Sequence, residues 1–446
     1  MYGPKSRDAS VILKIVAGTT LIESAVGFWL WQHGSNTFDQ FVSTPDTPGY
    51  VGIALQLAET FKLPPSPRTL GYPFFLAMGD LLGGRDYGSY LAVAIQLALN
   101  ILMTVVCWRM LERLVPTVSE TVRLLVTLLF FWAGLGMALF LMTDFMAAVW
   151  FGMFVYGFLF WRSRTGLVMA GVGLALATLT RPTFTFVPLL LPLAAYLAGR
   201  VSSKVPFGAV VAIAGLGLAA TGASIAYQYT FDRYLGPSPV LLRNVEDSLY
   251  NSEIEGSGMT LTDYQRQFEQ RTADAAGKDF SELSPRERDL IAGAFLREAM
   301  AAHPVKIALH WGMNFLKYLL VPVESTIARM ISRDHSLDNY NGGVIRFLSL
   351  LICLPLWAFA LAPPINGSQR ERMYHWLMLL CVTYVIAVSS VASGAAERMR
   401  FPVLMLMLPT MAWNLDATAV FVRRKYLRSN HVSTQGPQIV APMNPR

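Results

Sequence analysis

The chain has 446 residues, of which 54% are hydrophobic and only 15% are charged, and its mean hydropathy is +0.43. These values exclude an ordinary soluble domain and indicate a protein that lies in a lipid bilayer. The formal net charge of +7 comes from positive residues that cluster at the ends of apolar segments, so it predicts membrane topology and not a nucleic-acid partner.

Ten apolar runs are predicted membrane spans, since roughly twenty apolar residues cross the hydrocarbon core of a bilayer. The first run is not followed by a small-residue cleavage site, so we expect a retained anchor and not a removed signal peptide. The sequence therefore predicts an all-α polytopic membrane protein. The spans cover residues 11–32, 88–108, 122–141, 144–161, 166–180, 183–198, 206–228, 344–362, 373–392 and 402–422.

Positive residues in the short loops predict the orientation of these spans. Six groups of lysine and arginine fall on one side if there are ten spans, and the positive-inside rule makes that side cytoplasmic. Both termini are then cytoplasmic, the membrane is the inner membrane of a bacterium, and the long loops face the periplasm. The groups are Lys5, Arg7 and Lys14; Arg109, Arg113 and Arg123; Arg162 and Arg164; Arg200 and Lys204; Arg370 and Arg372; and Arg423, Arg424, Lys425 and Arg428.

The first long outer loop, residues 33–87, is predicted to hold two short amphipathic helices over 48–62 and 73–82. Asp46 precedes the first of these helices, in the string TPDTPGY. An aspartate at the outer face could accept the proton of an acceptor hydroxyl during displacement at a sugar C1. Local sequence alone favours a simpler role for Asp46 as a turn or helix-cap residue.

The second long outer loop, residues 229–343, is the only sizeable polar region. Ser284, a following proline and Glu287 predict a helix start with a reciprocal cap, and His303 before a proline predicts the end of that helix. Residues 304–320 are apolar enough to resemble an eleventh span. Their polar residues recur on one helical face, however, so we expect an amphipathic helix in the membrane interface. His310 on that face is a candidate substrate-binding residue.

These elements divide the chain into four parts. Residues 1–228 form an N-terminal module of seven spans that carries the first outer loop, and residues 229–343 form a periplasmic insertion. Residues 344–428 form a C-terminal module of three spans, and residues 429–446 are predicted to be a disordered tail.

Arginines at the predicted outer face are candidate ligands for a phosphate, because a planar guanidinium binds oxyanions through two parallel hydrogen bonds. Arg181 is the most informative, since it is an isolated positive charge on the side that the topology rule disfavours; snorkelling to headgroups is the alternative. Asp144, at the turn before the fourth span, reads equally as a helix cap or as a second acidic group of one site. Arg68, Arg398 and Arg400 lie on the same predicted side. For Arg398 and Arg400, a salt bridge with Glu397 or contact with lipid headgroups is an equal alternative to substrate binding.

Other polar residues have simpler interpretations. Glu23, Gln96 and Asn100 lie inside spans, where we expect them to bond to one another or to a neighbouring helix and not to form a proton relay. The three cysteines lie in apolar runs, and the six histidines have no ligand spacing. We therefore expect no metal site.

At these residues the sequence resembles the GT-C superfamily of polytopic glycosyltransferases, in particular the bacterial branch related to protein mannosyltransferases and aminoarabinose transferases. The resemblance covers most of the chain as an ordered layout of short motifs. They are Pro45-Asp46 followed by Tyr50 and a helix, Arg68 followed by Gly71-Tyr72-Pro73, the Leu-Thr-Arg181-Pro turn, and Glu397-Arg398 followed by Pro402.

This resemblance implies transfer of a sugar from a polyprenyl-phosphate donor to a lipid, glycan or protein acceptor. It implies Asp46 as the catalytic residue and Arg68, Arg181, Arg398 and Arg400 around the donor phosphate, with Asp144, Tyr50, Tyr72, Glu397 and His310 as substrate-binding candidates. The first loop has no Asp-x-Asp string, unlike the metal-dependent members. We therefore expect that no metal or other cofactor is required.

Two other functions remain open at this point. Glu23 and the number of spans keep a transporter or lipid flippase possible, although a transporter is expected to have related halves and the sequence shows no internal repeat. A nonenzymatic subunit of an envelope assembly machine is the third hypothesis, with residues 229–343 as its docking surface.

Overall fold

The computed structural model describes residues 6–32, 47–63, 68–85, 87–160, 163–201, 205–232, 235, 258–320, 355–365, 367–390 and 396–434. Within these ranges the regular structure is helical and contains no strand, which confirms the all-α prediction. Nine of the ten predicted spans coincide with helices: α1 (Ser6–Gln32), α5 (Gly88–Leu114), α6 (Glu120–Ala138), α7 (Thr143–Phe160), α8 (Arg164–Thr180), α9 (Val187–Val201), α10 (Phe207–Asp232), α17 (Gln369–Ser390) and α18 (Ala396–Thr434).

Seven of these helices are long and apolar enough to cross a membrane, whereas α8 and α9 are shorter. The eighth predicted span, 344–362, lies mostly outside the described residues, and its residues 355–361 are helical. The helix predicted over 183–198 begins later, at Val187, after a 3-10 turn η1 (Pro182–Phe184). Arg181, which precedes Pro182, has an extended backbone (φ −140°, ψ 129°), because the helical region is disfavoured for a residue before proline.

Helices α7 and α8 form the closest pair of the bundle, and glycine allows their approach. A Cβ atom on Gly173 of α8 would lie 2.7 Å from the carbonyl oxygen of Trp150 on α7. In the same way a Cβ on Gly157 of α7 would lie 2.7 Å from the carbonyl oxygen of Gly166. Small residues at such positions let two membrane helices pack backbone against backbone, so the α7–α8 pair forms a rigid centre.

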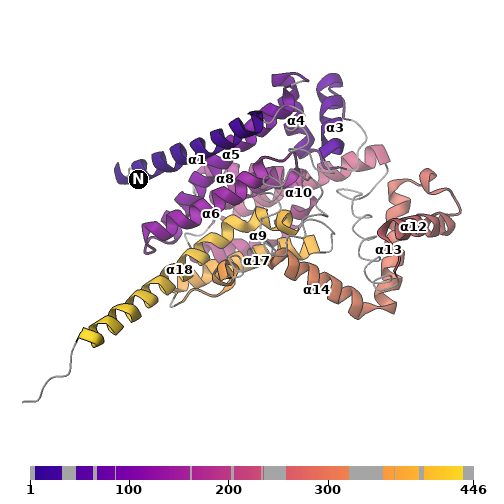
Figure 1. Cartoon of the computed structure of the whole chain (residues 1–446). Helices are drawn as coiled ribbons and strands as arrows, with labels where there is room; N and C mark the ends of the chain where they lie inside the picture. Colours follow the sequence, from indigo (N-terminus) through magenta and orange to yellow (C-terminus); the bar gives the residue numbers. More distant parts are fainter. Residues whose placement is uncertain are drawn as a thin grey trace, which may run out of the picture.

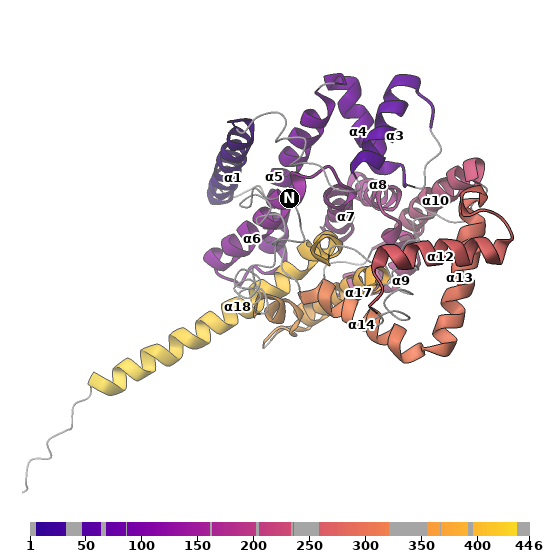
Figure 2. The same cartoon turned by 45° about the vertical axis from the view of Figure 1, so that its right-hand side comes forward.

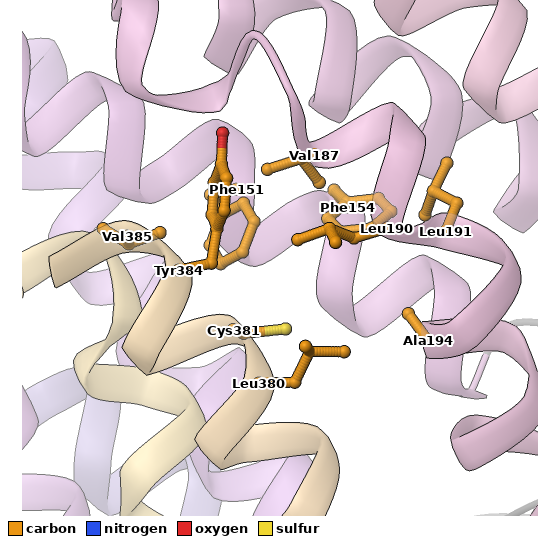
Figure 3. A pocket seen from close by; sticks show the side chains of 10 residues that line it. All are labelled: Phe151, Phe154, Val187, Leu190, Leu191, Ala194, Leu380, Cys381, Tyr384 and Val385. Atoms are coloured by element: carbon orange, nitrogen blue, oxygen red, sulfur yellow. The ribbon is translucent and has the colours of Figure 1, made fainter. Parts of the chain in front are cut away.

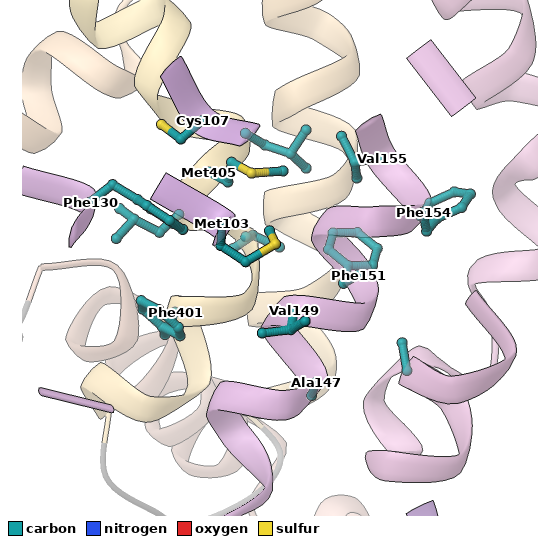
Figure 4. Packing of buried hydrophobic residues seen from close by; sticks show 14 of the residues in the cluster. Met103, Cys107, Phe130, Ala147, Val149, Phe151, Phe154, Val155, Phe401 and Met405 are labelled. Carbon is teal, nitrogen blue, oxygen red and sulfur yellow. The ribbon is translucent and has the colours of Figure 1, made fainter. Parts of the chain in front are cut away.

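The hydrophobic core lies where α5, α6, α7 and α18 meet. Figure 4 shows Met103 of α5, Phe130 of α6 and Met405 of α18 in contact between the helices, beside Phe151 of α7. Phe401, near the start of α18, stacks on Phe130 with ring centroids 6.0 Å apart. The first and last thirds of the chain therefore share one core.

The polar residues inside this bundle bond to one another, as predicted. Asn100 donates one hydrogen bond to Glu23 of α1 (3.1 Å) and another to the carbonyl of Phe131 (3.3 Å). Gln96 donates to the carbonyls of Ala138 and Phe140 at 2.7 and 3.0 Å. Hydrogen bonds between polar side chains of this kind connect helices in lipid, so α1 is held to α5 by a polar contact.

Helices α3 (Thr47–Thr60) and α4 (Gly71–Gly83) agree with the two helices predicted in the first outer loop. They pack against each other, and α4 also packs on α5 and α8. Figure 1 shows the two as an upright pair beyond the end of the long helices. This arrangement sets the loop residues before α3 and between α3 and α4 against the helix ends of the bundle.

The predicted second outer loop, residues 229–343, contains α12 (Leu261–Ala276), a short turn η2 (Phe280–Glu282), α13 (Pro285–Ala302) and α14 (Pro304–Leu320). The predicted start of α13 is confirmed, because Ser284 and Glu287 form a reciprocal capping box, and the predicted end is confirmed at His303. Tyr264, Phe268 and Phe295 form a small separate core between α12 and α13. In Figure 2 these helices extend away from the bundle, and α14 leads back to it.

Helix α14 has the predicted bounds and is amphipathic, with its polar side turned toward the protein. Asn314 donates to the carbonyl of Ser390, the last residue of α17 (3.2 Å), and lies 3.0 Å from the Nε2 atom of His310. An apolar stripe on α14 remains exposed and consists of Val305, Leu309, Met313 and Leu316. An exposed stripe of this kind is typical of a helix that contacts lipid.

The helices run between two ends of the bundle. At one end Arg370 donates to the carbonyl of Arg113 (3.0 Å), and the amide of Ser119 donates to Asp416 of α18 (3.1 Å). We call this the Arg113 end; two of the six predicted positive groups meet there. In Figure 1 the first described residues and the far end of α18 both lie toward this side, away from α3 and α4.

The C-terminal helix is longer than predicted. Helix α18 continues to Thr434 and so covers the first six residues of the tail predicted over 429–446; the rest of that tail lies outside the described residues. The helix also begins earlier, at Ala396, and passes through Pro402 and Pro409. Both prolines lie beyond the first four residues of α18, whose amides have no partner within the helix, so each removes one hydrogen bond of the helix interior.

Candidate functional site

The centre of the candidate site is an ion pair between α7 and α8. Nη1 of Arg181 lies 2.6 Å from Oδ1 of Asp144, and the exposed fractions of the two side chains are 12% and 0%. Asp144 is in the first turn of α7, and Arg181 is the residue that ends α8. The structure therefore joins two residues that the sequence offered separately.

Local electrostatics explain why these two charges are tolerated in a buried position. The N-terminus of a helix carries a partial positive charge and the C-terminus a partial negative charge. Asp144 stands at the N-terminus of α7 and Arg181 at the C-terminus of the antiparallel α8, so each charge lies at the helix end that stabilises it. The sequence left two interpretations of Asp144 open, a helix cap and an acidic group of the site. Its position at the start of α7 beside Arg181 is compatible with both.

Helix α4 brings Arg68 to this pair. The hydroxyl of Thr69 donates to the carbonyl of Thr180, 2.8 Å away, so Arg68 and Arg181 are each next in sequence to a residue of this hydrogen bond. The approach is close: a Cβ atom on Gly71 would lie 2.7 Å from Oγ1 of Thr180 and 2.8 Å from its amide nitrogen. The glycine of the predicted Gly71-Tyr72-Pro73 motif is therefore required by backbone contact between α4 and α8.

Arg68 itself is oriented by Tyr50 of α3. Its guanidinium carbon lies 4.8 Å from the centre of the Tyr50 ring, and its Nη1 atom donates to the Tyr50 hydroxyl at 3.3 Å. The carbonyl of Arg68 accepts a hydrogen bond from Gln228 near the end of α10 (3.4 Å). A cation over an aromatic face gains about 0.5–1 kcal/mol at exposed sites and more where water is excluded.

Tyr72 links this aromatic contact to the core of the bundle. Its ring meets the Tyr50 ring edge-on with centroids 5.5 Å apart, and its hydroxyl donates to Gln96 of α5 at 3.0 Å. Burial raises the pKa of the Tyr72 hydroxyl well above its usual value, and the neighbouring charges of Tyr50 and Asp144 raise it further. Tyr72 is thus a neutral hydrogen-bond donor that lies within electrostatic range of the ion pair.

The segment that carries the predicted catalytic residue joins the bundle at the same place. Asp46 lies outside the described residues, but Thr47, the next residue, is described. The buried hydroxyl of Thr47 donates to the carbonyl of Leu141 (3.0 Å), three residues before Asp144. We call this end, where Thr47, Asp144 and Arg181 lie, the Asp144 end of the bundle.

The start of α18 reaches the Asp144 end as well. The ring of Phe401 stacks on that of Phe145, which follows Asp144, with centroids 6.1 Å apart. Glu397, Arg398 and Arg400 belong to the first helical turns of α18, immediately before Phe401, and were predicted to precede the last span. Their side chains lie outside the described residues. Their backbone positions are therefore adjacent to the site, and their roles stay predictions.

His310 lies on α14, near the last residue of α17 and not among the residues around Arg181. Its described partner is Asn314 on the same helix, which bonds to the last residue of α17. The contacts described for Tyr50, Arg68, Tyr72, Asp144 and Arg181 connect those five residues to one another through α3, α4, α7 and α8. The structure thus gathers five of the ten predicted site residues, and it sets His310 at the end of α17.

An apolar pocket lies beneath the turn that follows Arg181, between α7, α9 and α17. Its volume is ≈ 20 Å³, which is little more than the room that one water molecule needs. Figure 3 shows Tyr384 of α17 at its edge, with the hydroxyl pointing toward the chain above, and Leu380 and Cys381 below. The remaining lining residues are Phe151, Phe154, Val187, Leu190, Leu191, Ala194 and Val385.

The sequence did not single out Thr47, Thr69 or Tyr384, although all three hold backbone groups at the Asp144 end. The hydroxyl of Tyr384 donates to the carbonyl of Thr183 at 2.7 Å and accepts from the amide of Phe186 at 3.2 Å. Each of these contacts joins residues at least 94 positions apart in the chain. Local sequence carries no signal for such pairings, because a hydroxyl in an apolar run gives no indication of its partner.

Within the described residues, no group of three or more His, Cys, Asp or Glu side chains is placed to hold a metal ion. Among those residues, the chemistry that the site offers is an ion pair, a second guanidinium and several hydroxyl donors. Comparison of the chain with models of protein families, with curated proteins and with solved structures gave no match.

Proposed function

We propose that this chain is a membrane glycosyltransferase that moves a sugar from a polyprenyl-phosphate donor to a lipid, glycan or protein acceptor. We further propose that it acts at the periplasmic face of a bacterial inner membrane. The observation that carries the proposal is the clustering of Arg68, Arg181 and Asp144 at one end of an apolar helix bundle. The cluster adjoins Thr47, the residue after Asp46.

The charge of the cluster suits an anionic headgroup. Among its described residues, Arg68 and Arg181 contribute two positive charges and Asp144 one negative charge, which leaves a formal charge of +1. The Asp144 carboxylate contacts one terminal nitrogen of the Arg181 guanidinium, and the five N–H donors of a guanidinium can serve a carboxylate and a phosphate together. A hydrocarbon chain attached to that phosphate would remain among the apolar helices.

The proposed reaction needs one base and one stabilised leaving group. An acceptor hydroxyl attacks C1 of the sugar, the bond between C1 and the phosphate oxygen breaks, and the lipid phosphate leaves with that electron pair. Asp46 takes the proton of the hydroxyl. Arg68 and Arg181 stabilise the negative charge that grows on the phosphate, which is the step where fixed positive charge lowers the barrier most.

Purified protein supplied with labelled polyprenyl-phosphate sugars tests this proposal. We expect the wild type to consume a donor, Asp46→Asn to abolish turnover, and Arg181→Ala to weaken it strongly. Arg200→Gln is the matched control, since Arg200 is a cation in the last turn of α9, at the end of that helix remote from η1. A wild type that consumes no donor, or two site variants with full turnover, would overturn the proposal.

The side of the membrane requires its own test. We expect a reporter fused after residue 330 to be periplasmic and one fused after Ser368 to be cytoplasmic. Ser368 adjoins Arg370, which bonds to Arg113 at the other end of the bundle. The reverse result would put the Asp144 end in the cytoplasm and exclude a periplasmic acceptor.

A further inference from the structure

The connection between α8 and α9 carries Arg181 and is held from two opposite sides by distant side chains. On one side Thr69, which precedes α4, donates to the carbonyl of Thr180. On the other side Tyr384 of α17 donates to the carbonyl of Thr183 and accepts from the amide of Phe186. Three backbone groups of this short connection are thus paired with hydroxyl groups.

These contacts add to the local restraint on Arg181. Arg181 is extended, between the last residue of α8 and the η1 turn; its amide bonds to the carbonyl of Ala177, and its carbonyl accepts from the amide of Phe184. An extended residue between two helical elements can rotate about φ and ψ unless its neighbours are fixed. The Thr69 contact fixes the residue before Arg181, and the Tyr384 contacts fix the residues two and five positions after it.

Packing adds to the restraint on the α17 side. The fully buried ring of Phe184, within the turn, stacks on Phe151 of α7 with centroids 4.8 Å apart. The same Phe151 lines the apolar pocket whose edge is formed by Tyr384. The turn therefore rests on α7 and is tied to α17, so its position depends on the C-terminal module as well as on the N-terminal one.

We propose that Tyr384, together with Thr69, is a positioning residue for Arg181. By fixing the turn, Tyr384 holds the guanidinium where it contacts Asp144 and the headgroup phosphate of a lipid-linked substrate. The identity of that ligand rests on the proposed glycosyltransferase function; the ordering of the turn does not.

The chain contains a matched control for the Tyr384 hydroxyl. Tyr374 lies ten residues earlier on the same helix, is fully buried, and donates to the backbone carbonyl of Leu406 at 2.9 Å. Tyr374→Phe removes one hydroxyl bond to backbone, and Tyr384→Phe removes the two hydroxyl bonds to Thr183 and Phe186; each variant keeps the ring. Only Tyr384 bonds to the turn that follows Arg181, so general destabilisation and positioning can be distinguished.

The binding arm uses polyprenyl phosphate without a sugar, measured by native mass spectrometry on the full chain. We expect Tyr384→Phe, which loses two hydrogen bonds to the turn, to weaken binding at least about threefold, because each lost bond contributes roughly threefold to tenfold. In an Arg181→Gln background the same change should have an effect below about twofold, because it acts through Arg181. Tyr374→Phe should bind as the wild type does. Equal losses in both backgrounds, or an equal loss for Tyr374→Phe, would overturn the proposal.

The second arm requires no ligand. Hydrogen exchange of a peptide covering residues 181–187 should be faster in Tyr384→Phe, since the Phe186 amide loses its acceptor, and unchanged in Tyr374→Phe. Thr69→Val should speed exchange of the same peptide to a smaller extent. Unchanged exchange in Tyr384→Phe would overturn the positioning role. A wild type that binds no polyprenyl phosphate but shows the expected exchange would instead overturn the proposed function.

Discussion

Arg181 and Asp144 form a buried ion pair in which Nη1 and Oδ1 are 2.6 Å apart, across the C-terminus of α8 and the N-terminus of α7. Their positions at oppositely polarised helix ends make the pair part of the α7–α8 packing as well as part of the candidate site. Changes to either residue should therefore affect stability and ligand binding together, and the two effects can be measured separately.

Removing one member of the pair should destabilise the protein. Asp144→Asn leaves the Arg181 charge without its carboxylate, and a broken buried pair costs about 3–5 kcal/mol. We expect a lower thermal midpoint in detergent for Asp144→Asn and for Arg181→Gln. The double variant should lose less than the sum of the two single losses, because both charges are then gone. Additive losses would show that the two side chains do not interact.

Gly71→Ala should destabilise the contact between α4 and α8. The added methyl group would lie 2.8 Å from backbone atoms of Leu179 and Thr180, and overpacking of this kind costs about 1–3 kcal/mol. Gly52→Ala is the control, since Gly52 lies in α3 and an added Cβ meets nothing within 4 Å. Replacing a helical glycine there should stabilise by about 0.5–1 kcal/mol. Thermal unfolding of both variants tests the difference in sign.

The start of α13 should weaken in acid. The contacts with Lys278 and with the capping Ser284 lower the pKa of Glu287 from 4.5 to about 2. A lowered pKa in the folded state adds stability above pH 4.5, and this contribution is lost as the pH falls from about 4.5 to about 2. The difference in thermal midpoint between wild type and Glu287→Gln should shrink over that range. The exposed Glu269, changed to Gln, serves as control.

Glu23→Gln should leave sugar transfer intact. Glu23 accepts a hydrogen bond from Asn100 between α1 and α5, and a glutamine carbonyl can accept the same bond without burying a charge. We expect turnover within about twofold of wild type, which corresponds to less than about 0.5 kcal/mol. A transporter driven by protons at this carboxylate would lose its activity. Loss of donor turnover in Glu23→Gln would contradict this prediction and give the carboxylate a role in sugar transfer.

Chelation should not stop the reaction. The leaving group is a phosphate anion, and two guanidinium groups at the site can stabilise its charge in place of a metal ion. We expect protein treated with EDTA and then dialysed to retain full donor turnover. A loss that Mg²⁺ or Mn²⁺ restores would contradict this prediction and would call for a metal site that includes Asp46.

Much of the fold follows from the sequence alone. Length and hydropathy of the apolar runs predict nine of the helices, because lipid forces each spanning backbone to satisfy its own hydrogen bonds. Local rules also predict the reciprocal cap at Ser284 and the helix end at His303, since these depend on neighbours within four residues. The full length of the last helix did not follow from hydropathy, because hydropathy indicates where a segment leaves the membrane and not where its helix ends.

Only the tertiary structure decided which polar residues meet. The sequence offered Asp144 and Arg181 as separate candidates with ordinary alternatives, and the packing of α7 on α8 made them a pair. The contacts of Thr47, Thr69 and Tyr384 depend on the relative heights and rotations of helices far apart in the chain. Hydropathy predicts that a segment lies in the membrane. Lipid tails are as apolar as the side chains of the helices, so hydropathy does not select which helices meet. The choice of neighbours therefore comes from close packing and from pairing of polar groups.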